Sequence, residues 1–413
     1  WRVDAYGEWL VLSSLAAFLS MSDVGFATAA ANEMTMRIGR GDREGAIIVY
    51  QSMWALLTGL GLAVLAAVLA ALWATPVAGW LALKTITPGY AAAVLSVLAV
   101  YILVGLQLGV VHAGFRCDGN FALGQLLGTI QRLAEFVAQI AAAAATGSML
   151  AVATAGLAVR CVSIALWLAI LSRRSPWLPL GVSRASAATI RRLAIPALSF
   201  MGMPLGHALG NQGLIQVVAA TLGPAAVVVF SAHRTICNIA TQLVNMLAVA
   251  VWPEFSLSFG AEDRRATRRL HRVACRWSIW LGAVGCAALA IAGPLLIPAW
   301  TGGRVQCHLP LFGALLASVV VRIAWWTSSV VPMSINGHQR MSLTYLLATT
   351  ASLVLAMLLM PQLGVAGAAV SLLATDMLMV WYVLPASLTA VDDSLASFLK
   401  SLVTIPIRSS TMA

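Results

Sequence analysis

Hydrophobic residues form long continuous runs along this chain, and short polar breaks separate them. The runs are about 20–28 residues long, which is the length that an α-helix needs to cross the hydrocarbon of a bilayer. They lack the alternation of apolar and polar residues that is typical of membrane β-barrels. The pattern predicts about eleven membrane-spanning helices, at residues 9–30, 47–73, 88–115, 121–146, 148–171, 193–220, 223–252, 274–298, 308–335, 341–360 and 364–388.

The composition supports a bilayer as the main solvent of the chain. Hydrophobic residues make up 61% of the 413 residues and charged residues only 9%, whereas a soluble domain has about 25% charged residues. Because lipid offers the backbone no hydrogen-bond partner, the spans must be helices. The six cysteines are scattered without a CxxC pair, so neither a disulfide framework nor a metal site is predicted. We therefore expect an all-α polytopic membrane protein.

The net charge of +11 is best interpreted as a topology signal. Cationic residues are concentrated in one set of alternate loops and in the tail, and these are expected to face the cytoplasm. This places residue 1 outside and the C-terminus inside the bacterial inner membrane, and it leaves no case for nucleic acid as a partner. The cytoplasmic set comprises Arg37, Arg40, Arg43, Arg116, Arg173, Arg174, Arg184, Arg191, Arg192, Arg264, Arg265, Arg268, Arg269, Arg272, Arg276, Arg340, Lys400 and Arg408, against Arg2, Lys84 and Arg304 outside.

An internal repeat divides the chain into two halves. The segment 33–43 matches the segment 254–264 at four positions. Weaker echoes join 154–159 to 365–370, and Gly119 to Gly337. The pattern predicts an N-lobe at 1–172, a basic cytoplasmic linker at 173–192, a C-lobe at 193–390 and a cytoplasmic tail at 391–413. Two such lobes are expected to hold a substrate between them near the middle of the membrane. The four repeated pairs are Glu33/Glu254, Gly39/Gly260, Asp42/Asp263 and Arg43/Arg264.

The repeat also predicts a helix that precedes the chain. Glu254 ends the second span after the basic linker, whereas Glu33 ends the first span of the chain. The front half is therefore one span short of the back half. The chain also begins with Trp1. We expect a protein of six plus six helices whose first helix is missing here.

Several segments resemble the Wzx-type lipid-linked oligosaccharide flippases, which are polysaccharide exporters of the multidrug/oligosaccharidyl-lipid/polysaccharide (MOP) superfamily. The resemblance lies in residues 6–9, 18–25, 39–44, 222–226, 230–234 and 251–254. It implies a two-lobed bundle of twelve helices that passes undecaprenyl-pyrophosphate-linked sugars, such as O-antigen units of lipopolysaccharide, across the inner membrane. It further implies a lipid-linked oligosaccharide substrate and polysaccharide polymerase or assembly proteins as partners.

Four arginines are expected within spans: Arg132, Arg160, Arg234 and Arg322. An arginine at the centre of a membrane helix is costly and usually faces a cavity, so these are candidates for binding an anionic substrate. Polar stripes at helical spacing extend two of them, through Gln139 in one half and through Asn238 and Asn245 in the other. The alternatives are that Arg132 pairs with Glu135, that Arg234 satisfies buried carbonyls, and that Arg160 and Arg322 extend to the interface.

Acidic and polar residues supply further candidates. Asp376 and Glu135 could exchange a coupling proton or Na⁺, because burial raises a carboxyl pKa, or could form structural ion pairs instead. His207 and Asn211 could face sugar, although the Gly202, Gly206 and Gly210 series on the same helix favours tight packing. The repeated residues Glu33, Asp42, Arg43, Glu254, Asp263 and Arg264 are candidates for a cytoplasmic gate or turn.

Three functions remain open from the sequence. An ion-coupled flippase with a cationic cavity agrees with the excess of intramembrane arginine. A multidrug exporter of the same superfamily would be expected to favour acidic and aromatic cavity residues. A membrane polysaccharide polymerase or glycosyltransferase lacks support, because no DxD-like motif or catalytic His/Asp spacing is present. The run of arginines from Arg265 to Arg276 predicts contact with anionic membrane lipids.

Overall fold

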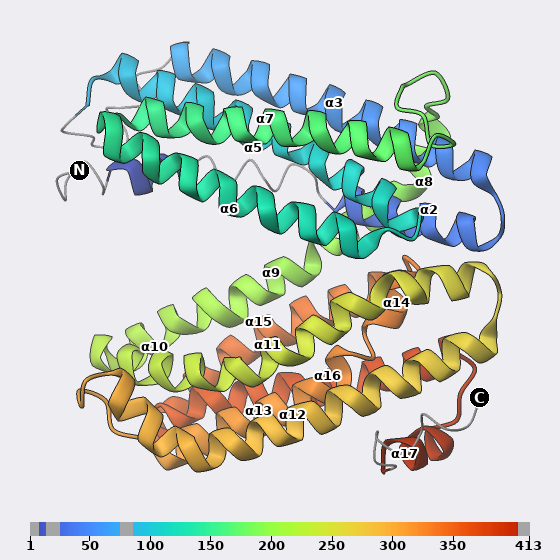
Figure 1. Ribbon diagram of the computed structural model, residues 1–413. Helices are drawn as coiled ribbons and strands as arrows, with labels where there is room; N and C mark the ends of the chain where they lie inside the picture. The colour runs from blue at the N-terminus through green and yellow to red at the C-terminus, as the bar shows by residue number, and fades with distance from the viewer. Residues whose placement is uncertain (1–7, 14–24, 75–85, 404–413) are drawn as a thin grey trace. The chain divides into compact units, whose positions relative to one another are not determined.

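The computed structural model describes residues 8–13, 25–74 and 86–403, and helix labels follow Figure 1. In these ranges the chain is helical, with no strand, and it divides into two compact units at residues 1–197 and 198–413. Nine of the described helices are long and apolar enough to cross a membrane by length and composition. The all-helical membrane fold predicted from the apolar runs is therefore confirmed.

The first unit is a bundle built on long helices: α2 (Phe26–Gly39), α3 (Arg43–Ala74), α5 (Pro88–Cys117), α6 (Phe121–Thr146) and α7 (Met149–Arg174). α7 packs against both α5 and α6, and α5 also packs against α2 and α3 (Figure 1). Side-chain caps begin two of these helices, because Thr87 and Ser148 accept hydrogen bonds from backbone amides of the first turn. Such caps satisfy amides that have no partner inside the helix.

The second unit contains α11 (Pro224–Gly260), α12 (Arg264–Trp300), α13 (Leu309–Trp326), α14 (Val330–Ser334), α15 (Gln339–Leu363), α16 (Ala366–Ala390) and α17 (Leu395–Val403). α16 packs against α13 and α15, as α7 packs against α5 and α6 in the first unit. A large apolar core between these helices includes Phe230, Phe312 and Leu372. Each unit therefore has a core of its own, and the packing order of its last three long helices recurs in the other.

The repeat seen in the sequence recurs in the helix ends. α2 ends at Gly39 and α11 at Gly260, and the next helices begin at Arg43 and Arg264. Asp42 and Asp263 accept hydrogen bonds from backbone amides of the helices that follow them, at 2.8 and 2.9 Å. The repeated residues thus form matching helix-turn-helix corners. The other echoed turn differs by one position, since the left-handed residues are Gly119 in one unit and Asn336, beside Gly337, in the other.

One span is interrupted at mid-helix. The chain from Ala187 to Leu222 consists of α8 (Ala187–Phe200), α9 (Gly202–Ala208), a π-helical turn η2 (Leu209–Gly213) and α10 (Leu214–Leu222). Pro196 lies inside α8, and a proline removes one hydrogen bond from a helix ladder. π-turns within α-helices occur frequently at functional sites.

Some predicted boundaries need correction. The basic connection at 253–273 is almost entirely helical, because α11 continues to Gly260 and Asp263 caps α12 immediately afterwards. The span predicted at 308–335 is divided into α13 and α14. The span at 121–146 forms the helix α6, but polar residues such as Gln131 and Glu135 leave it outside the nine most apolar helices. The span at 9–30 falls largely outside the described residues.

Candidate functional site

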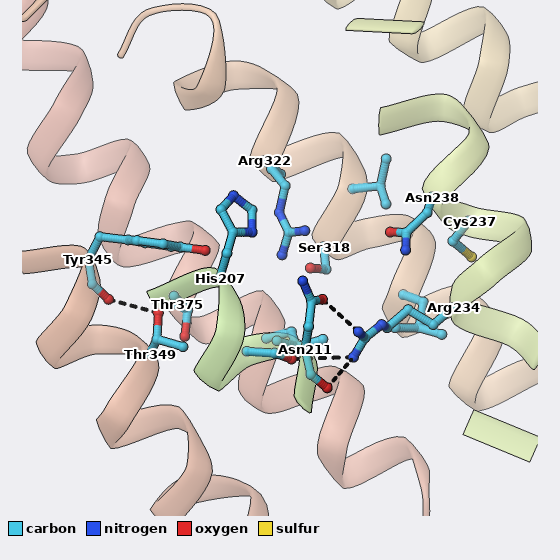
Figure 2. A pocket seen from close by; sticks show the side chains of 14 residues that line it. His207, Asn211, Arg234, Cys237, Asn238, Ser318, Arg322, Tyr345, Thr349 and Thr375 are labelled. Carbon is cyan, nitrogen blue, oxygen red and sulfur yellow. Dashed lines mark hydrogen bonds between the residues drawn. The ribbon is translucent and has the colours of Figure 1, made fainter. Parts of the chain in front are cut away.

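A small polar pocket lies within the second unit, between α9–η2, α11, α13, α15 and α16 (Figure 2). Its free volume is about 30 Å³, which is room for a water molecule. A larger ligand could enter only if the side chains at its rim moved. The polar residues that line it are His207, Asn211, Arg234, Asn238, Ser318, Arg322, Tyr345, Thr349 and Thr375.

Arg234 extends from α11 to the π-helical turn across the pocket (Figure 2). Its guanidinium donates to the side-chain oxygen of Asn211 at 2.6 Å and to the backbone carbonyls of Gly210 and Asn211 at 3.3 and 3.4 Å. The ring of Phe230 lies 5.4 Å from its charged carbon, within the range of a cation–π contact. In the described part of the chain Arg234 has no salt-bridge partner. Arg234 therefore lines a pocket and also satisfies carbonyls, and its role in binding a substrate stays a prediction.

Arg322 and Asp376 form a buried ion pair at one wall of this pocket. Arg322 donates from Nε and Nη2 to the two carboxylate oxygens of Asp376, each at 3.1 Å. Ser318 and Trp325, from the same helix as Arg322, donate to that carboxylate at 2.6 and 3.1 Å. The Asp376 side chain is 1% exposed. The suggestion that Arg322 extends to the interface is wrong, because its charge is neutralised inside the bundle.

His207 and Asn211 both reach the pocket, and contact with sugar stays a prediction. His207 contacts the rings of Trp326 and Tyr345 edge-on, with centroids 5.3 and 5.6 Å away. The tight-packing interpretation holds, because a Cβ placed on Gly206 would lie 2.6 Å from the Tyr345 ring. The glycines thus let α15 approach closely enough for its polar residues to meet those of α9.

The first unit holds a second buried ion pair. Arg160 on α7 donates to both carboxylate oxygens of Glu135 on α6, each at 2.8 Å. Tyr101 on α5 and Gln131 donate to the same carboxylate at 2.8 and 2.7 Å. The suggested pairing of Glu135 with Arg132 is wrong, and so is the extension of Arg160 to the interface. Both predictions fail for one reason: α6 packs against α7, and Arg160 on α7 lies next to Glu135 on α6 and pairs with it.

The two ion pairs lie on the last three long helices of their units, but their charged residues are distributed differently among those helices. In the first unit α5, α6 and α7 carry Tyr101, Glu135 and Arg160. In the second unit α13, α15 and α16 carry Arg322, Tyr345 and Asp376. Each set of three helices contains one arginine, one carboxylate and one tyrosine. The arginine lies on the last of the three helices in the first unit and on the first of the three in the second unit.

The remaining sequence candidates lie elsewhere. Arg132 is exposed on α6 and donates to Thr129 at 3.1 Å. Gln139 packs on Gly156 of α7. Asn245, further along α11 than the pocket, accepts a hydrogen bond from Trp326 at 3.3 Å. The single-helix stripe through Arg132 and Gln139 is therefore not one surface, because its members meet different neighbours.

The repeated corner residues have structural roles in the described chain. Glu33 accepts hydrogen bonds from Arg37 and Arg192 at 2.9 and 3.0 Å. Arg43 lies 5.6 Å from the ring of Trp177. Glu254 and Arg264 are exposed at the other corner. A gating role for these residues stays a prediction, whereas helix capping by Asp42 and Asp263 is directly visible.

Sequence reasoning missed several residues of the pocket, including Ser318, Thr349 and Thr375. A signal was present for some of them. Ser318, Arg322 and Trp325 stand at i, i+4 and i+7 on one helix, which places them on one face. Residues of small polar type such as Thr375 carry no such signal, because serine and threonine often bond only to their own helix.

Comparisons with known proteins identify the fold. No protein-family model matches the chain, and no curated protein matches its sequence. Solved structures match over nearly the whole chain at low sequence identity. A MATE structure in a bent conformation has a TM-score of 0.81 and 15% identity, covering 97% of this chain and 91% of that one.

Two further structures extend the match. An outward-facing multidrug resistance MATE family transporter of the MOP superfamily has a TM-score of 0.75 and 14% identity, covering 95% of this chain and 88% of that chain. A MOP superfamily transporter from Pyrococcus furiosus, with a binding pocket described as having reverse polarity, has a TM-score of 0.71 and 15% identity, covering 94% and 90%. The chain is therefore a multi-pass membrane protein with the fold of the MATE transporters of the MOP superfamily.

Proposed function

We propose that this protein is a membrane transporter that carries an anionic amphiphile, and that a lipid-linked oligosaccharide with a diphosphate group is the leading candidate. One observation carries the proposal. Arg234 is half-buried at a polar pocket and is held only by neutral oxygens in the described chain. A half-buried cation without a counter-charge favours a phosphate or carboxylate as its partner.

The charge count of the pocket agrees with an anionic ligand. Two guanidinium groups, from Arg234 and Arg322, line it, and Asp376 neutralises only Arg322. One positive charge is left over. Because the free volume is about 30 Å³, the pocket would anchor an anionic group at its rim while the rest of the substrate lay outside it. The amides of Asn211 and Asn238 would supply further hydrogen bonds to oxygen-rich groups.

A multidrug-type exporter is the second candidate. The fold favours it, because a matching structure is that of a multidrug resistance transporter. The aromatic residues Tyr345 and Trp326 beside His207 could contact a flat drug. The unpaired charge of Arg234 opposes cationic drugs, however, and the Pyrococcus furiosus transporter is described as having a pocket of reverse polarity that suggests a different function. A drug of this exporter would therefore be neutral or anionic.

Coupling to an ion is a separate part of the proposal. The carboxylates Asp376 and Glu135 each accept two bonds from an arginine and two from neutral donors. Their oxygens are thus already engaged, which supports the structural interpretation of both acids. A coupling proton or Na⁺ would have to displace at least one of these donors from either site.

Binding to the purified full-length chain tests the proposal. Undecaprenyl diphosphate and the cationic dye ethidium serve as probes, with the native chain and an Arg234→Gln variant in the same detergent. We expect diphosphate binding to weaken about 10- to 100-fold in the variant, since a charged hydrogen bond contributes about 1.5–3 kcal/mol. Arg304→Gln, which removes an exposed arginine outside the pocket, should leave binding unchanged. Ethidium binding that survives in all three proteins without any diphosphate binding would contradict the proposal.

A further inference from the structure

The last described helix, α17, is attached to α12 along one face (Figure 1). Phe398 is 2% exposed, and its ring stacks on His271 of α12 with centroids 5.1 Å apart. The indole of Trp280 donates to the carbonyl of Leu402 at 3.1 Å. These contacts fix which side of α17 faces the bundle.

A second face of α17 is apolar and has no cover in the described chain. Leu395, Leu399 and Val403 are 52%, 48% and 77% exposed. They stand at i, i+4 and i+8, which places them in one stripe along the helix. Ser397 and Lys400 occupy the side away from this stripe. A short helix with this division into an apolar and a polar side is typical of segments that lie in a membrane interface.

The place where α17 contacts α12 agrees with a position in the membrane interface. α12 is one of the nine helices that can cross a membrane, and its first turns carry the arginines while its body is apolar. Trp277 and Trp280 lie where the arginine-rich first turns of α12 are followed by its apolar body, and they are 45% and 38% exposed. Tryptophan is enriched at the level of the lipid headgroups. Because α17 contacts α12 at Trp280, it is held at this level.

The arginines at the start of α12 divide into two groups. Arg268 and Arg272 form salt bridges to Asp392 and Asp393, at 3.0 and 2.5 Å, and so fasten the connection between α16 and α17. The second group consists of Arg264, Arg265 and Arg269, which are exposed. No salt bridge is recorded for them within residues 8–13, 25–74 and 86–403. Asp392 and Asp393 are thus matched to the first group. Asp263, directly before the second group, accepts a hydrogen bond from the amide of Ala266 as the cap of α12, and within the described residues neither it nor Glu262 forms a salt bridge with these arginines.

We propose that α17 lies in the cytoplasmic interface of the membrane and that, together with Arg264, Arg265 and Arg269, it forms a binding surface for the phosphate headgroups of anionic phospholipids. The apolar stripe enters the acyl boundary, and the arginines contact the headgroups beside it. Each arginine near an anionic surface contributes about 1 kcal/mol. Membrane lipid covers this stripe, since the helix to which α17 is fastened is itself a membrane span.

The depth of α17 is the first test. Single cysteines are placed at Leu399 and at Ser397, two positions on opposite sides of the helix, in a background in which the more accessible native Cys161 and Cys307 are serine. Both are labelled with a fluorophore in the full-length chain and reconstituted in vesicles of phosphatidylcholine and phosphatidylglycerol. We expect a nitroxide lipid to quench the label of Leu399→Cys, and aqueous iodide to quench that of Ser397→Cys. Equal quenching of both labels by iodide would overturn the proposal.

Lipid preference is the second test. The detergent-purified chain is titrated with phosphatidylglycerol and, separately, with phosphatidylcholine, and binding is followed by the shift of the thermal unfolding midpoint. The variant with Arg264→Gln, Arg265→Gln and Arg269→Gln should bind phosphatidylglycerol about 100-fold more weakly, or about five-fold per arginine. Arg304→Gln, beyond the other end of the same helix, is the matched control and should bind as the native chain does.

The remaining outcomes also decide the proposal. Glycerol phosphate without acyl chains should give no shift, because the proposal requires a lipid surface and not a free phosphate. An equal shift with both phospholipids would contradict it. Disulfide-linked dimers formed through Leu399→Cys in vesicles would assign the apolar stripe to a second copy of the chain and overturn the lipid assignment.

Discussion

At the scale of single residues, the carboxylate of each of the two buried ion pairs, Arg322–Asp376 and Arg160–Glu135, accepts four hydrogen bonds. Asp376 receives two bonds from Arg322, one from Ser318 and one from Trp325. The attraction between two buried charges roughly offsets their loss of hydration only while both partners are present. Removal of either partner leaves a charge in a medium that cannot solvate it.

We predict a large asymmetry between single and double substitutions at this pair. Asp376→Asn leaves Arg322 uncompensated and should destabilise the chain by about 3–5 kcal/mol. The double variant Asp376→Asn with Arg322→Gln removes both charges and should recover most of that loss. Thermal unfolding in detergent of the native chain, both single variants and the double variant measures the coupling. Additive effects of the two single substitutions would contradict the prediction.

The salt bridge at the start of α17 predicts a pH dependence. Arg272 donates two hydrogen bonds to Asp393 and thereby holds the pKa of that carboxyl below its ordinary value. A carboxyl with a lowered pKa in the folded state contributes stability above its unfolded pKa of about 4 and loses it as the pH falls through the folded value. The difference in unfolding midpoint between the native chain and Asp393→Asn should therefore be constant from neutral pH down to about 4 and shrink below it. A difference that grows with acidification would contradict this assignment.

The residue contacts also mark the limit of what helical spacing can predict. Four intramembrane arginines could be identified from the sequence because a charge stands out in an apolar run. Their partners could not. Arg132 and Glu135 share a helix face by spacing, yet Glu135 pairs with Arg160, which lies on the next helix. Spacing along one helix assigns a face but not the neighbour that covers it.

At the scale of elements, close approach of helices depends on small residues at particular points. A Cβ placed on Gly367, at the start of α16, would lie 2.8 Å from backbone atoms of Leu359 and Met360 on α15. Backbone atoms at this distance cannot rotate away as a side chain can. The contact between α15 and α16 is therefore built around the absence of a side chain at this position.

We predict that Gly367→Ala destabilises the second unit by about 1–3 kcal/mol, the usual consequence of overpacking. Gly313 is the matched control, because it lies within α13 and a Cβ there meets nothing within 4 Å. Gly313→Ala should be neutral or stabilising by up to about 1 kcal/mol through helix propensity. Unfolding midpoints of the two variants in the same detergent compare them. Equal shifts would show that helix propensity, not the contact with α15, decides the outcome.

Matching corners could be predicted from the sequence, but the exact ends of helices could not, since the span predicted at 223–252 continues to Gly260. The repeated Gly, Asp and Arg residues predicted matching corners, and the helices do end and begin at those residues. The π-turn at Leu209–Gly213 had no distinct signal, because glycine every fourth residue is equally typical of tight packing in a continuous helix. Its carbonyls contact Arg234, and Gly210 is 24 residues from Arg234 along the chain. Tertiary contacts of this kind cannot be predicted from the local sequence pattern.

At the scale of the whole molecule, the distribution of arginine predicts the orientation in the membrane. The corner between α11 and α12 should face the cytoplasm and the connection between α12 and α13 the outside. Ala261→Cys and Arg304→Cys, both at exposed positions and in the background with serine at Cys161 and Cys307, test this. An impermeant maleimide should label Arg304→Cys in spheroplasts with an intact inner membrane, and Ala261→Cys only after permeabilisation. The reverse pattern would invert the assigned topology.

The fold class could be predicted from the sequence because a bilayer admits few solutions. Long apolar runs can only be helices in lipid, and the repeat at 33–43 and 254–264 predicts two halves. The polar pocket could not be predicted as a unit, because it is assembled from five segments that each contribute a few residues. Its two arginines, Arg234 and Arg322, were the members with a strong signal of their own.

The arginine and the carboxylate of the two ion pairs lie on different helices of their units, and this limits the exchange of helices between the units. α7 carries the arginine of its trio, whereas α16 carries the carboxylate of the other. A chimera with α7 in place of α16 would remove Asp376 and leave Arg322 without its carboxylate, and the reverse exchange would leave Glu135 without Arg160. The two halves are thus no longer interchangeable parts. Exchange of either helix between the units would leave a buried charge without its partner, which is strongly destabilising.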